Sequence, residues 1–130
     1  MMPVPAIFHV ETSGRTIVVV PQQNIGSLAD EQVQPELQAI LQQLAQPDLA
    51  NLVIDFEKVD YFGSSMLEAM LKLWKTVDAA GGKTAICNLS RVGLEVLQIG
   101  RFDTLWTILP SREEALRWVG EESPHPKAAN

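Results

Sequence analysis

Two adjacent serines, Ser64 and Ser65, stand where the sequence changes from an apolar, strand-like run to a stretch with helical periodicity. A serine hydroxyl at a helix start has two common uses. It accepts a hydrogen bond from a free backbone N–H of the first turn, or it remains available for modification such as phosphorylation. Two serines at a helix start are usually both caps, and the alternative is one cap and one hydroxyl that stays available for modification.

The spacing of the following residues assigns these two uses. Glu68 follows Ser65 at the S-x-x-E spacing of a capping box, which predicts Ser65 as the N-cap and Glu68 as its reciprocal partner. The hydroxyl of Ser64 is then the less committed one. A phosphate there would add about −1.5 to −2 charge at the positive end of a helix, where an anion gains roughly 0.3 to 1 kcal/mol. We expect phosphorylation to preserve the fold and to weaken a partner that must desolvate the added charge.

The acidic residues near the serines lack the companions that catalysis or metal binding would need: Asp55, Glu57, Asp60 and Glu68. The two histidines, His9 and His125, lie far from them in the sequence and form no ligand-spaced cluster. Cys87 is the single cysteine, so it is expected in the core rather than in a disulfide. We predict solvated or capping roles for the carboxylates, no metal, no cofactor and no enzymatic activity.

The length, hydrophobic content and net charge of the chain indicate which kinds of partner it can bind. The chain has 130 residues, of which 46% are hydrophobic, enough for one domain with one core. Its net charge of −6 argues against nucleic acid or an anionic membrane as a partner, because both attract clustered Lys and Arg. No apolar run approaches the roughly 20 residues that span a bilayer, and the first residues lack the pattern of a secretory signal. We therefore expect a cytoplasmic protein that binds another protein.

The hydrophobic periodicity predicts an α/β fold in the order β-β-α-β-α-β-α-β-α, with a mixed β-sheet partly covered by four helices. The expected strands are 6–10, 16–20, 52–56, 84–87 and 104–109, and the expected helices are 28–46, 65–79, 90–100 and 111–119. Ser27 or Asp30, then Ser90 and Ser111, are the expected caps of the other helices. Residues 1–119 should form a single domain and residues 120–130 a flexible C-terminal tail.

The three tryptophans fall on apolar sides of the expected elements: Trp74, Trp106 and Trp118. Large aromatic side chains in such positions pack in the core or at its edge, and near a surface they also anchor interfaces. Core or edge packing is the default expectation for all three.

Six short motifs keep an order and spacing that resemble the STAS family, the domain of bacterial anti-sigma factor antagonists that also occurs in sulfate transporters. They are Ile54-Asp55-Phe56, Gly63-Ser64-Ser65-Met66, Gly81-Gly82, Cys87-Asn88-Leu89-Ser90, Arg101-Phe102-Asp103-Thr104-Leu105 and Ser111-Arg112-Glu113-Glu114-Ala115-Leu116. The antagonists of this family carry Asp-Ser-Ser-Gly at the turn, so Gly63 and Met66 are departures from the pattern.

The resemblance implies a STAS-like fold and a regulatory, non-enzymatic role in signalling and transcription control. It implies that Ser64 is the position phosphorylated by an anti-sigma factor kinase, and that the partner is an anti-sigma factor or a related serine kinase. The implied partner surface combines the turn with the loop before the first helix: Gly63, Ser64, Ser65, Met66, Asn24 and Gly26. The alternative is a STAS-like scaffold or constitutive binder whose altered turn is not phosphorylated.

Overall fold

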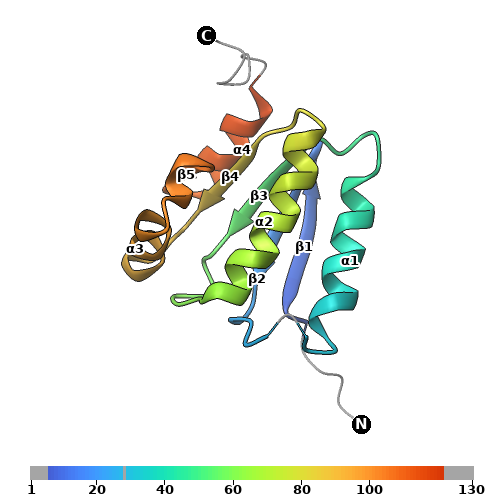
Figure 1. The fold of residues 1–130 in the computed structure, drawn as a ribbon. Coiled ribbons are helices and arrows are strands. Elements are labelled where there is room, and N and C mark those ends of the chain that lie inside the picture. Colours follow the sequence, from blue (N-terminus) through green and yellow to red (C-terminus); the bar gives the residue numbers. More distant parts are fainter. Residues whose placement is uncertain (1–5, 28, 122–130) are drawn as a thin grey trace.

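A five-stranded mixed sheet forms the centre of the protein in a computed structural model that describes residues 6–27 and 29–121 (Figure 1). The strands lie in the order β1-β2-β3-β4-β5, with β1 antiparallel to β2 and the remaining pairs parallel. Their bounds are Phe8–Ser13 for β1, Thr16–Pro21 for β2, Asn51–Asp55 for β3, Thr84–Cys87 for β4 and Thr107–Leu109 for β5. The predicted fold class and element order are confirmed.

Within the described residues, four α-helices and one short 3-10 helix cover the sheet. They are α1 (Val33–Leu44), α2 (Ser64–Ala79), α3 (Arg91–Ile99), the 3-10 helix Phe102–Thr104 and α4 (Arg112–Gly120). In Figure 1, α1 and α2 lie in front of the sheet and α4 lies behind it. The sheet is therefore a middle layer with helices on both faces, as parallel strands require.

Side chains along each strand point alternately to the two faces of the sheet, so the apolar residues form two cores, one on each face. In β3, Leu52 and Ile54 belong to the core under α1 and α2, whereas Val53 belongs to the smaller core under α4. Successive strand side chains point to opposite faces, so one strand supplies both cores. Cys87 lies in the α4 core and is fully buried, as predicted.

The first helix is shorter than its apolar pattern predicted, because it begins at Val33 rather than near residue 28. Ser27 Oγ accepts from the N–H of Ala29, and Asp30 Oδ1 accepts from the N–H of Gln32. Both side chains are thus used in turns that precede the helix. Gln32 is the N-cap and has no side-chain bond, so the predicted cap at Ser27 or Asp30 is wrong.

The last strand is also shorter than predicted, since residues 102–104 form the 3-10 helix instead. The backbone N–H groups of Leu105 and Trp106 both donate to the carbonyl of Phe102. The rings of Phe102 and Trp106 stack with centroids 5.4 Å apart, which packs this turn against the core. Only Thr107–Leu109 remains to pair with β4.

The stop predicted after the second helix is confirmed at Gly81 and Gly82. Gly81 has φ +83°, the left-handed conformation that ends helices and that glycine adopts without strain. A Cβ on Gly82 would lie 1.7 Å from the carbonyl oxygen of Ala50, so only glycine allows this close approach. The chain then enters β4 directly.

No helix within residues 6–27 and 29–121 is long and apolar enough to cross a bilayer. The predicted tail falls largely on residues 122–130, which lie outside the described residues. Gly120, where the tail was expected to begin, is the last residue of α4.

Candidate functional site

The carboxyl ends of β2, β3 and β4 meet at one edge of the sheet, at the bottom of Figure 1. We call this the carboxyl edge. Three segments emerge there: residues 22–27 after β2, residues 56–63 after β3, and residues 88–90 after β4. Such edges commonly carry binding sites in open α/β folds.

Gly63, Ser64 and Ser65, together the serine turn, begin α2 at this edge. Gly63 is the N-cap and has extended backbone angles, φ −116° and ψ −161°. Its carbonyl accepts the first helical hydrogen bond, from Leu67 N–H at 3.2 Å. Its own N–H donates to Asn24 Oδ1 at 3.1 Å, which ties the turn to the loop after β2. The structure thus brings Asn24 and the serines together, as the resemblance implied.

The predicted capping box of Ser65 and Glu68 is wrong. Because Gly63 is the N-cap, Ser64 and Ser65 are the first two residues of the helix, and the box position three residues after the cap is Met66. The helix start has no side-chain cap bond. The contact between Asn24 and Gly63 N–H fixes the start two residues earlier than local sequence alone predicted.

The two serine hydroxyls are left without a hydrogen bond in the part of the chain that the structure describes. Ser64 is exposed and Ser65 half-buried. The first N–H groups of a helix have no partner within it, and a glycine N-cap offers them no side-chain oxygen. The serine turn therefore presents an unused hydroxyl beside unused backbone donors at a positive helix end.

Met66 does not belong to the partner surface, contrary to prediction. Its side chain is 0% exposed and packs in the core under α2, one helical turn before the buried Met70. The earlier helix start turns the third residue inward, because positions three and four apart share a face. The departure from the family's glycine is thus accommodated inside the protein and leaves the approach to Ser64 open.

The loop after β2 lies beside the serine turn and is anchored by Ile25, which is buried. Its neighbours Asn24 and Gly26 are exposed. Asn24 contacts Gly63 as described, whereas Gly26 has no atom within 4 Å of the position of a Cβ. Gly26 therefore lies on an open part of this loop.

The segment between β3 and α2 adds an exposed residue that was not predicted as part of the site. The rings of Phe56 and Phe62 stack with centroids 4.6 Å apart and hold the two ends of the segment. Between them, the side chain of Tyr61 is 61% exposed. An aromatic residue three positions before Ser64, in the loop that leads to the serines, was the signal that could have identified it.

The start of α3 joins this segment through Ser90. The Ser90 hydroxyl donates to the carbonyl of Asp60 and accepts from the N–H of Gly93 at 3.0 Å, which confirms it as the N-cap. The next turn exposes Val92, at 48%. Tyr61 and Val92 therefore extend the exposed surface of the carboxyl edge from the serine turn to α3.

Asp55 is neither solvated nor a cap, contrary to prediction. Its side chain is 0% exposed, and one oxygen accepts from Arg112 Nε at 2.7 Å. The other oxygen accepts from Asn88 Nδ2 at 2.9 Å and from the N–H of Glu57 at 3.0 Å. The Asp55 cluster thus joins β3, the end of β4 and α4, and all its polar contacts are structural.

The Asp55 cluster affects the protonation of two neighbouring side chains, Arg112 and Cys87. The hydrogen bond from Arg112 to Asp55 raises the pKa of the guanidinium, so Arg112 stays charged. Burial, and secondly the charge of Asp55, raise the pKa of the Cys87 thiol to about 12, so this thiol is not a nucleophile at neutral pH. Within the described residues, no group of three or more His, Cys, Asp or Glu side chains is placed to hold a metal ion.

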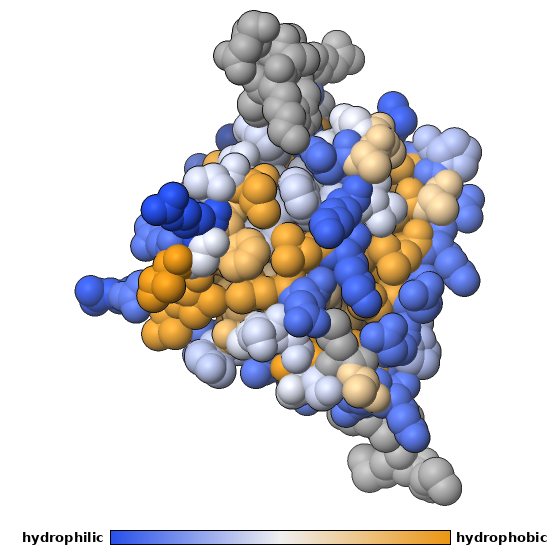
Figure 2. Space-filling view, viewed as in Figure 1, coloured by the Kyte–Doolittle hydropathy of each residue, from blue (hydrophilic) through white to orange (hydrophobic). Residues whose placement is uncertain are grey.

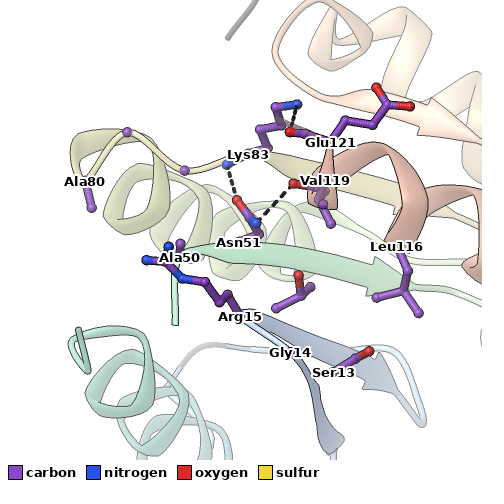
Figure 3. A pocket seen from close by; sticks show the side chains of 14 residues that line it. Ser13, Gly14, Arg15, Ala50, Asn51, Ala80, Lys83, Leu116, Val119 and Glu121 are labelled. Carbon is purple, nitrogen blue, oxygen red and sulfur yellow. Dashed lines mark hydrogen bonds between the residues drawn. The ribbon is translucent and has the colours of Figure 1, made fainter. Parts of the chain in front are cut away.

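A cavity lies at the opposite edge of the sheet, away from the serines. It has about 640 Å³ and is lined by the turns that precede β2, β3 and β4 (Figure 3). Asn51 bridges its walls, since it donates to the carbonyl of Val119 and accepts from the N–H of Lys83. None of the predicted site residues lines this cavity.

A comparison with known families gives one match: the STAS domain, over residues 8–115. This range includes every strand, α1 to α3 and the serine turn. No curated protein matches the chain.

Several solved structures share the fold. An anti-sigma-factor antagonist (STAS) domain protein from Planctomyces limnophilus is 24% identical, with a TM-score of 0.71 over 88% of this chain and 98% of that one. A putative anti-sigma factor antagonist from Thermotoga maritima is 17% identical, with a TM-score of 0.74 over 88% and 95%. The Bacillus cell fate determinant SpoIIAA in its phosphorylated form is 23% identical, with a TM-score of 0.63 over 86% and 98%.

Proposed function

Since the chain belongs to the STAS domain family, we propose that it is a regulatory binding module of the anti-sigma factor antagonist type. It binds an anti-sigma factor or a related serine kinase at the carboxyl edge, and phosphorylation of Ser64 weakens that binding. It acts in the cytoplasm, in the control of transcription, and catalyses no reaction of its own.

The observation that carries this proposal is the state of Ser64. Its side chain is exposed at the first position of α2, and within the described residues its hydroxyl makes no hydrogen bond. A kinase can therefore reach the oxygen without breaking a native contact. A serine that served the fold would be expected to hold a bond, as Ser90 does.

The position of Ser64 also supports a switch that spares the fold. A phosphate on Ser64 would lie beside the unused N–H groups of the first turn of α2, where negative charge is stabilised. A partner seated on the serine turn would have to desolvate about −1.5 to −2 units of added charge unless it supplied a cation. Binding is thus lost while folding is kept.

The partner surface combines the serine turn with apolar side chains at the same edge. Gly63, Ser64, Ser65, Asn24 and Gly26 supply its polar part. Exposed Tyr61 and Val92 supply apolar anchors, and aromatic anchors beside polar groups are typical of interfaces.

The test uses three baits: wild type, Ser64→Ala and Ser64→Asp. Proteins captured from the native cell extract by the wild-type bait are purified and titrated against each bait. The proposal predicts at least a tenfold loss of affinity for Ser64→Asp, about 1.4 kcal/mol, with the melting temperature unchanged. Equal affinity of all three baits for every captured protein would contradict the switch.

One observation favours a second function, a scaffold or constitutive binder that uses the same surface without phosphorylation. The family's aspartate before the serines is Gly63 here, so a carboxylate that could orient the hydroxyl is absent. This alternative predicts that Ser64→Ala and Ser64→Asp bind alike, and that Gly63→Asp alone confers phosphorylation by the cognate kinase.

A further inference from the structure

The partner surface at the carboxyl edge has two halves that are attached to the sheet in different ways. The serine turn is tied to the loop after β2, because Gly63 N–H donates to Asn24 Oδ1 at 3.1 Å. The apolar half consists of the exposed side chains of Tyr61, in the segment after β3, and Val92, at the start of α3. In Figure 2, apolar residues gather on the left side of the molecule, where Figure 1 places α3. The apolar half is therefore carried by segments other than the serine turn and needs a support of its own.

One carboxylate oxygen of Asp55 binds both segments of the apolar half. It accepts from the N–H of Glu57 at 3.0 Å, just after β3, and from Asn88 Nδ2 at 2.9 Å, just after β4. Asn88 lies two residues before the N-cap of α3 and has φ +56°, a left-handed conformation that is uncommon outside glycine. The N-cap, Ser90, joins the two segments again, since its hydroxyl donates to the carbonyl of Asp60. The apolar half is thus fixed to the sheet through one carboxylate.

The charge of this carboxylate is balanced from the other face of the sheet. The Asp55 side chain is fully buried, and a buried charge requires a partner within the protein. Arg112 is that partner, because its Nε donates to the second oxygen of Asp55 at 2.7 Å. Arg112 is the first residue of α4, which lies behind the sheet in Figure 1. Its guanidinium also contacts the carboxylates of Glu11 and Glu57. A cation on α4 therefore supports the carboxylate that holds the apolar half.

We propose that Asp55 and Arg112 are a positioning pair for partner binding. The pair holds the two segments of the apolar half, whereas Asn24 holds the serine turn. This role presupposes the binding function proposed above for the carboxyl edge, and it gives the two halves of that surface separate supports. Loss of the pair weakens binding by loosening the apolar half, and phosphorylation of Ser64 weakens it at the serine turn alone.

Three variants test the pair. Arg112→Gln removes the cation, and Arg112→Lys keeps a cation beside Asp55 without the planar fork of the guanidinium. Asn88→Gly allows the left-handed backbone and removes the amide that donates to Asp55. The matched control is Arg117→Gln, which removes an exposed arginine of the same helix whose ion pair with Glu113 lies at the surface. Where Arg112→Gln fails to fold, Asn88→Gly decides the point, because it breaks a contact of the same carboxylate.

Hydrogen exchange of the full ¹⁵N-labelled chain measures each half without any partner. The N–H groups of Glu57 and Gly93 report on the apolar half, and that of Leu67, which donates to the carbonyl of the N-cap of α2, reports on the serine turn. Arg112→Gln should lower the protection of both apolar-half reporters at least tenfold relative to Leu67. Asn88→Gly should do so at Gly93. An equal loss at all three N–H groups, or no loss, would overturn the proposal.

Affinity for a purified protein captured by the wild-type bait gives the second readout. Arg112→Gln should weaken binding at least tenfold and by the same factor in wild type and in Ser64→Asp, since separate supports have additive effects. Arg112→Lys should recover most of the affinity, and Arg117→Gln should leave it unchanged. Unchanged affinity in Arg112→Gln and Asn88→Gly would overturn the positioning role even if Ser64→Asp weakens binding. Equal binding by wild type and Ser64→Asp would overturn the switch instead, and the exchange data would still decide the role of the pair.

Discussion

The starts of α2 and α3 lie at the same edge of the sheet and both carry serine, but they use it differently. At α3, the Ser90 hydroxyl accepts from the N–H of Gly93 and donates to the carbonyl of Asp60. At α2, the N-cap is Gly63, and neither the Ser64 nor the Ser65 hydroxyl has a hydrogen bond in the described chain. The serine hydroxyl at the start of α3 stabilises the fold through two hydrogen bonds, whereas the serine hydroxyls at the start of α2 make none.

This difference shows how the protein separates stability from regulation. The start of α2 is held by groups other than its serines, namely the contact of Gly63 with Asn24 and the packing of Met66. A change of charge at Ser64 therefore does not remove a contact on which the helix depends.

Met66→Ala should cause the largest loss, about 3 kcal/mol in the free energy of unfolding. The side chain is fully buried under α2, and its removal leaves a cavity that the packed core cannot fill. Urea unfolding followed by circular dichroism measures the loss. The neighbouring Ser65→Ala is the matched control and should change stability by less than about 0.5 kcal/mol. A Met66→Ala variant as stable as wild type would mean that the residue is not a core anchor.

Ser90→Ala should destabilise the protein by about 1 kcal/mol, since it removes an N-cap bond. Ser64→Ala should stay within about 0.5 kcal/mol of wild type, because its hydroxyl has no bond to lose. The two variants are compared in the same urea titration. Similar losses in both would show that the two helix starts use serine in the same way, and the comparison would fail.

Asn24→Ala should cost about 0.5 to 1 kcal/mol, the usual worth of one hydrogen bond. It frees Gly63 N–H and should also loosen the serine turn, which hydrogen exchange at the amides of residues 63–66 measures. Gln23→Ala, an exposed neighbour in the same loop, is the control. Unchanged exchange in Asn24→Ala would argue against the loop as a support of the turn.

Gly63→Asp should have the smallest effect on stability, a gain of a few tenths of a kcal/mol from a better N-cap. The backbone at Gly63 suits any residue, and no atom lies within 4 Å of the added Cβ. Thermal unfolding at neutral pH detects the gain. A clear destabilisation would mean that the aspartate side chain does not fit at this position, contrary to the open space around Gly63.

The sequence was sufficient for the fold because the apolar pattern is local and strong. Strand alternation and helical spacing predicted the five strands and four α-helices in order, although not the 3-10 helix. Ser90 and Ser111 were correctly identified as caps, each accepting from the N–H three residues on. These contacts join near neighbours, so they follow from short spacings.

The candidate site was predicted less well because distant residues set its details. Asn24 lies 39 residues before Gly63 and contacts it, and Gly63 is the N-cap of the helix. The predicted N-cap at Ser65 and the predicted place of Met66 on the partner surface were therefore both wrong. Arg112 lies 57 residues after Asp55 and makes that carboxylate a buried, paired group. The sequence predicted a solvated or capping role for Asp55, since nothing near it in the sequence identifies Arg112 as its partner.

The central claim is that Ser64 accepts phosphate, and intact mass combined with fragment mapping of the chain purified from its native cells tests it most directly. Wild type and the variants Ser64→Ala and Ser65→Ala are expressed in those cells and compared under the same growth conditions. The account predicts one added phosphate in wild type and in Ser65→Ala, mapped to Ser64, and none in Ser64→Ala. Absence of phosphate from all three chains, or its location at any other residue, would contradict it.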